Sequence, residues 1–199
     1  MKVIVLMLVS LLTLLAISTL AAEREDHKVA TQLAIIRAAT AKYHDVEKAK
    51  ADGYIQISQM APDMGYHFRN PKLKGTELDK PHMLLYVRDT SGDWQLVGAE
   101  WTYPKGERPS NFPLQGEWNI HSAACHYKDA TEIREPVEAK CPSKNKAGGE
   151  LAYWHPDLET FHAYVWVPHP DGLKGVFSVR NPFLTPFNPK PTEPGHVAR

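Results

Sequence analysis

The sequence predicts a single α+β domain in which an N-terminal amphipathic helix packs on a mainly antiparallel sheet. Three features predict this fold. A helical pattern of apolar residues stands near the start, short extended segments with turn signals follow it, and the chain has 16 Pro but only 12 Gly. This composition favours fixed turns and extended connections over further long helices. We expect the domain to cover residues 23–187, with a flexible Pro-rich tail at 188–199.

Residues 1–22 have the features of a secretory signal peptide. Lys2 supplies a positive charge, residues 3–17 form an apolar run, and residues 18–22 are rich in small side chains, as signal peptidase cleavage requires. The run is short for a membrane span, and acidic residues follow it at once. We therefore expect cleavage, a secreted or periplasmic protein and no stable membrane span afterwards. An uncleaved anchor helix is the alternative.

Residues 27–52 predict one amphipathic helix. Apolar side chains recur there at intervals of three and four residues, and Gly53 follows as a stop signal. The residues of this apolar face are Val29, Leu33, Ile36, Ala39, Tyr43, Val46 and Ala49. We expect this face to pack against the sheet.

Three later segments predict strands. Residues 83–88 and 94–103 are separated by the turn residues 91–93, so these two strands are expected to form a hairpin. Residues 160–167 are rich in aromatic and β-branched side chains and give the strongest strand pattern in the chain. Pro168 ends this strand.

Charge and motifs exclude several classes of function. Lys plus Arg equals Asp plus Glu, at 23 each, so there is no electrostatic argument for nucleic acid or for an anionic membrane surface. The sequence has no HExxH, GxSxG, Walker or GxGxxG motif and no haem-attachment motif. Nucleotide binding and the standard hydrolase triads therefore have no support.

The two cysteines, Cys125 and Cys141, lie 16 positions apart. In an oxidising compartment such a pair is expected to form one disulfide. Closing a loop of that size stabilises the fold by about 3 kcal/mol in the chain-entropy model. A thiolate metal ligand or a reactive nucleophile is the alternative, although no CxxC pair supports it.

Polar residues inside two of the predicted strands are the candidates for function. Alternation places His162 on one face of its strand together with Tyr164 and Trp166, and Glu100 lies inside the apolar segment LVGAEW. Glu100 and His162 are therefore expected to project from neighbouring strands into one polar pocket. His67 follows Met64-Gly65-Tyr66 in an otherwise apolar stretch, so a loop is expected to add it to the pocket.

The helix is expected to add His44 to the same pocket. Three imidazoles and one carboxylate suit a divalent transition metal, namely zinc, copper, nickel or iron. The proposed ligands are thus His44, His67, Glu100 and His162, with Asp45 and Tyr164 as hydrogen-bonding partners around them. Such a site would serve metal binding or metal-dependent chemistry on a small molecule.

Two other interpretations remain open. The histidines are structural, or the pocket takes a carbohydrate or another flat ligand on an aromatic face. That face consists of Tyr66, Trp101, Tyr164 and Trp166. The remaining histidines give weaker patterns: His121 and His126 lie five apart, which suits neither a helix nor a strand, and prolines interrupt the run that contains His155.

Four segments resemble a family of uncharacterised exported bacterial proteins: ATAKYHDVEKAKADGY, MGYHFRNP, LLYVRDTSGDWQLVGAEW and FHAYVWVPHPDGLKGVFSVRNP. The resemblance covers roughly residues 38–183. It implies no established activity, but it singles out by position His44, His67, Glu100 and His162. Residues 104–150, with both cysteines, depart from the family pattern, so the expected disulfide is particular to this chain.

Overall fold

The structure, a computed structural model, describes residues 23–189. The predicted signal peptide and the last ten residues of the predicted tail lie outside the described residues. Asn188 belongs to the described part, and its amide exchanges two hydrogen bonds with Asp63, to the backbone N–H and to the carboxylate, both at 2.8 Å. The chain is therefore attached to the domain up to this residue.

The fold is α+β, as predicted, and a six-stranded antiparallel sheet forms its centre. The strand order is β1-β2-β3-β4-β9-β5. The bounds are β1 (Ile55–Gln56), β2 (Tyr66–Arg69), β3 (Met83–Arg88), β4 (Trp94–Pro104), β5 (Trp118–His121) and β9 (Leu158–Ala163). The predicted hairpin is confirmed, because β3 pairs with β4 across a turn in which Gly92 has a φ of 86°.

A second, three-stranded antiparallel sheet has the order β7-β6-β8. Its strands are β6 (Ala124–Tyr127), β7 (Glu132–Arg134) and β8 (Leu151–His155). The predicted disulfide is confirmed: Cys125 in β6 is joined to Cys141, which directly follows η2 (Glu138–Lys140). The disulfide ties the polar loop that follows β7 to the middle strand of this sheet.

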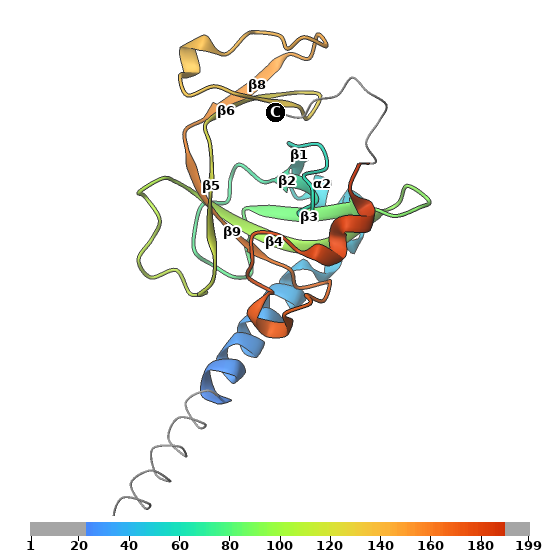
Figure 1. Ribbon diagram of the computed structural model, residues 1–199, viewed down its shortest axis with the longest axis vertical. Helices are drawn as coiled ribbons and strands as arrows, with labels where there is room; N and C mark the ends of the chain where they lie inside the picture. The colour runs from blue at the N-terminus through green and yellow to red at the C-terminus, as the bar shows by residue number, and fades with distance from the viewer. Residues whose placement is uncertain (1–22, 190–199) are drawn as a thin grey trace, which may run out of the picture.

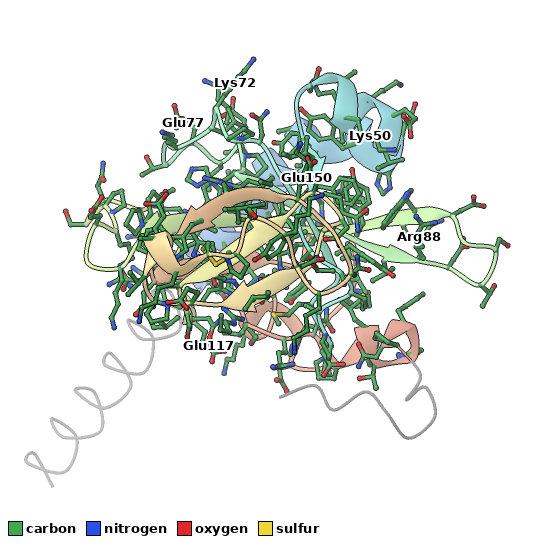
Figure 2. The ribbon with its side chains drawn as sticks, turned by 90° about the horizontal axis from the view of Figure 1, so that it is seen from above. Lys50, Lys72, Glu77, Arg88, Glu117 and Glu150 are labelled. Carbon is green, nitrogen blue, oxygen red and sulfur yellow. A yellow bond between two sulfur atoms is a disulfide. The ribbon has the colours of Figure 1, made fainter. Side chains whose placement is uncertain are left out.

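The two sheets and the helix form layers. The small sheet lies above one face of the six-stranded sheet, and the N-terminal helix (residues 23–40) lies below the other (Figure 1). Seen from above, β6 and β8 extend over the larger sheet, while the β3–β4 hairpin marked by Arg88 projects away (Figure 2). Contacts between the sheets include the Arg69 guanidinium of β2 over the Tyr153 ring of β8, at 5.1 Å.

Hydrophobic side chains fill the space between the helix and the six-stranded sheet. Leu33 and Ile36 of the helix are buried against Trp101 of β4 and Phe161 of β9. Burial of a side chain of this size stabilises the fold by about 1.5–3 kcal/mol. Among the described residues, no helix is long and apolar enough to cross a membrane.

The prediction of one continuous helix over 27–52 is wrong, although its apolar face is confirmed. The helix ends at Thr40 and is followed by the 3₁₀ turn η1 (Ala41–His44) and by α2 (Val46–Ala51). Asp45 causes the break: its backbone is extended, and its side chain accepts a hydrogen bond from the Glu47 N–H as the N-cap of α2. All seven predicted positions of the face are still buried or half-buried.

The predicted strand over 160–167 ends earlier, at Ala163. The Val165 N–H bonds to the carbonyl of Ala163, two residues back, and this tight turn interrupts the alternation of side chains. Trp166 consequently lies on the helix side of the sheet, where its Nε1 donates to the Thr40 hydroxyl at 2.9 Å. Its predicted position on the face of His162 is wrong.

Candidate metal centre

Three of the four predicted ligands, His67, Glu100 and His162, come together between the two sheets. They belong to three strands of the large sheet, β2, β4 and β9. Glu100 and His162 are direct partners across the β4–β9 ladder. His67 lies on β2, which is separated from β4 by β3, and it pairs with Leu85 of β3. The antiparallel register therefore aims all three side chains at the same face.

The ligand atoms of this group are close together and buried. His67 Nε2 lies 3.4 Å from Glu100 Oε2, and His162 Nε2 lies 3.7 Å from the same oxygen. The side chains of Glu100 and His162 are only 4% and 2% exposed. The same carboxyl oxygen thus lies close to both imidazoles in a buried site.

His67 is held in place by Ser58. The Ser58 hydroxyl accepts a hydrogen bond from the His67 backbone N–H at 2.9 Å and forms a second hydrogen bond with the ring Nδ1 at 3.0 Å. Gly65 shapes the entry to this strand, because it has a φ of 111° and lies against the carbonyl of Tyr86, where a Cβ would clash. These contacts leave His67 Nε2 directed at Glu100.

Tyr164, one of the two predicted neighbours, lies beside the site. Its ring stacks on His162 with the centroids 6.1 Å apart and the planes inclined by 5°. Its hydroxyl donates to the carbonyl of Val179 at 2.9 Å, so it supports His162 by packing and makes no hydrogen bond to the imidazole.

The buried polar atoms of this group lack hydrogen-bond partners within the described chain. They are Glu100 Oε2 and both ring nitrogens of His162. Burial alone raises the pKa of Glu100 to about 8. Burial, and to a smaller extent the proximity of His67, lowers the pKa of His162 to about 3. Burial likewise lowers the pKa of His67 to about 4, so both imidazoles are neutral near pH 7 and keep a lone pair for a ligand.

His44 and Asp45 lie elsewhere. His44 is exposed on η1, and its ring packs edge-to-face on Trp166 at 4.3 Å between centroids. Asp45 is the N-cap of α2. The structure therefore leaves His44 out of the group formed by His67, Glu100 and His162.

The four aromatic residues considered for a flat ligand do not form one platform. Trp101 is fully buried in the core under the helix. Tyr164 is fully buried in a different cluster, together with Met60 and Leu184. Trp166 packs against the helix side, as described above.

A second group of possible metal ligands was not expected from the sequence. His121 at the end of β5, His126 in β6 and His155 at the end of β8 have ring nitrogens within 4.8 Å of one another. Glu132 of β7 joins them, with Oε2 lying 3.4 Å from His121 Nε2 and 3.6 Å from His126 Nε2.

The spacing of these histidines explains why the sequence pattern was uninformative. Only Ser122 and Ala123 separate β5 of the large sheet from β6 of the small one. His121 and His126 therefore lie on strands of different sheets, where the periodicity of a single helix or strand does not apply. The signal that was present is composition, because three histidines occur within 35 residues.

The two groups are chemically suited to hold metal ions. Neutral imidazoles and carboxylates are the ligands that zinc, copper, nickel and iron take in proteins. The group of His67, Glu100 and His162 has two histidines and one carboxylate, and the second group has three histidines with a carboxylate at its edge.

Comparisons with known proteins do not identify the chain. No family model matches it, and neither the curated proteins nor the solved structures give a significant match. The resemblance to a family of exported bacterial proteins remains a prediction from the sequence segments. The geometry of the two groups therefore carries the functional argument.

Proposed function

We propose that this protein binds a divalent transition metal ion through His67, Glu100 and His162. The observation that carries the proposal is the set of buried, unpartnered atoms, because Glu100 Oε2 and the His162 ring nitrogens find no hydrogen bond among the described residues. A buried polar group without a partner costs about 1–3 kcal/mol. A cation between these atoms would remove that cost.

The distances fit this proposal. Two ligand atoms bound to one zinc ion at about 2.1 Å in tetrahedral geometry lie roughly 3.4 Å apart. The separations of 3.4 Å for His67–Glu100 and 3.7 Å for His162–Glu100 are within a few tenths of an ångström of this value. The ligand atoms of His67 and His162 lie within 4.8 Å of each other, so binding one ion requires at most a small approach of these two rings.

The donor set also suggests a class of chemistry. Two histidines and one carboxylate leave coordination positions open, as in hydrolytic zinc sites and in non-haem iron sites. The bound ion would act as a Lewis acid or as a redox centre toward a small molecule. Because the site is buried, only a small substrate would reach it, and Tyr164 would contribute packing behind His162.

Metal analysis of the purified chain tests this proposal. The protein is stripped with a chelator, loaded with Zn²⁺, passed through a desalting column and analysed for metal. The variant His162→Phe keeps a ring of similar size and should lose one equivalent of zinc. The matched control His27→Phe changes an exposed histidine on the helix and should bind as much zinc as the wild type. Equal zinc in His162→Phe and the wild type would contradict the proposal.

Export is the second part of this proposal. The signal-like pattern of residues 1–22 supports it, and so does the Cys125–Cys141 disulfide, since disulfides persist in oxidising compartments. N-terminal sequencing of protein recovered from the periplasm or medium should give a chain beginning near Ala22 or Glu23. A full-length chain retained in the cytosol would contradict export without affecting metal binding.

A further inference from the structure

We propose that His121, His126 and His155 form a second metal site, separate from the first, which takes a single Zn²⁺ or Cu²⁺ ion with Glu132 beside it. The three histidines are contributed by both sheets, β5 on one side and β6 and β8 on the other. An ion bound here would join the small sheet to the large one.

Hydrogen bonds to the backbone fix two of the three imidazoles in the form that binds metal. His126 Nδ1 lies 3.0 Å from the carbonyl oxygen of Ile57, and His155 Nδ1 lies 2.6 Å from that of Pro156. A carbonyl oxygen can only accept, so each Nδ1 carries the hydrogen and each Nε2 of the neutral ring presents a lone pair. Such an Nδ1–H bond to a carbonyl is the usual support of a metal-binding histidine.

The free Nε2 atoms are buried and unpartnered. His126 and His155 are 3% and 7% exposed, and neither Nε2 makes a hydrogen bond within the described chain. The Nε2 lone pair of His126 faces the Glu132 carboxylate at 3.6 Å. Two acceptors facing each other at this distance repel, unless a cation lies between them.

Glu132 supplies the negative charge that a bound cation requires. Arg134 holds its Oε1 at 3.0 Å, which leaves Oε2 for the imidazoles. The positive charge of Arg134 beside this carboxylate favours its ionised form.

The group is partly exposed at one edge. The side chains of His121 and Glu132 are each 29% exposed, whereas His126 lies inside. The ion would therefore enter past His121 and be bound by the inner imidazoles. The first site lies deeper, since its carboxylate is 4% exposed.

Titration of the chelator-treated full chain with Zn²⁺ alone tests the second site, by calorimetry and by metal analysis after desalting. The wild type should bind two equivalents. His155→Phe, which keeps an aromatic ring but removes the ring nitrogens, should bind one. His121→Gln changes a half-exposed side chain, and this variant should also bind one equivalent or bind its second zinc at least tenfold more weakly.

The control His162→Phe separates this inference from the proposed function. It should lose the first site and retain the equivalent that His155→Phe loses. If His155→Phe and His121→Gln bind as much zinc as the wild type, the second site is overturned and the first stands. If only His162→Phe leaves binding unchanged, the first site fails and the second stands. Circular dichroism of each metal-free variant identifies any that does not fold.

Discussion

Burial changes the protonation of Glu100 in the metal-free protein. Its pKa is raised by burial from 4.5 to about 8. The unfolded chain loses this proton near pH 4.5, but the folded chain keeps it until about pH 8. The stabilisation that the raised pKa brings is therefore present at low pH and is lost as the pH rises through 8.

This predicts a specific effect of Glu100→Gln in the metal-free protein. Between pH 7 and pH 9 the free energy of unfolding of the wild type should fall by about 1 kcal/mol more than that of the variant, since glutamine does not ionise. His67 and His162 are present in both proteins, so their protonation in the unfolded chain cancels in this difference. Urea unfolding at several pH values measures the difference. If the free energy of unfolding has the same pH dependence in the two proteins, the pKa of Glu100 is not raised.

At the scale of elements, the close approach of β4 and β9 brings Glu100 and His162 together. Gly98 lies two residues before Glu100, and a Cβ there would stand 2.7 Å from the carbonyl oxygen of Ala163. Gly98→Ala should therefore separate the two strands beside the site. We expect a loss of about 2 kcal/mol in stability and weaker zinc binding at the first site.

Gly106→Ala is the matched control for this change. Gly106 has a φ of 85° and nothing near its Cβ position, so alanine costs only backbone strain of about 1 kcal/mol. Its zinc affinity should equal that of the wild type. Equal zinc affinities in the Gly98 and Gly106 variants would show that the spacing of β4 and β9 does not position the ligands.

The small sheet depends on its disulfide in a similar way. Cys125→Ser combined with Cys141→Ser opens a loop with a sequence separation of 16 residues, which costs about 3 kcal/mol in the chain-entropy model. Because β6 carries His126, the double variant should also weaken zinc binding at the second site and spare the first. Urea midpoints and zinc titrations measure both effects. An unchanged urea midpoint would contradict this role of the disulfide.

The sequence predicted the features that follow from one repeating pattern of side chains, either the alternation along a strand or the helical repeat. Alternation along a strand was enough to place Glu100 and His162 in neighbouring strands, and the helical period found the buried face that includes Leu33 and Ile36. The helical repeat did not predict the break at Asp45, where a local N-cap interrupts the helix. It also failed for His121 and His126, whose proximity arises only when the chain crosses from one sheet to the other.

At the scale of the whole molecule, metal binding should stabilise the fold. A ligand at 100 times its dissociation constant stabilises the native state by about 2.7 kcal/mol per site. For a domain of this size that corresponds to an increase in Tm of roughly 5–10 °C. Thermal unfolding with and without Zn²⁺ should show this increase in the wild type and a smaller one in His162→Phe. Equal increases in Tm in both proteins would show that the stabilising ion does not bind to His162.

The most direct test of the account is a crystal structure of the zinc-loaded protein with anomalous data collected at the zinc absorption edge. We expect an anomalous peak about 2 Å from His67 Nε2, from Glu100 Oε2 and from a ring nitrogen of His162. A zinc-loaded crystal with no peak between these three side chains, and peaks only at exposed histidines such as His27 or His44, would contradict the central claim.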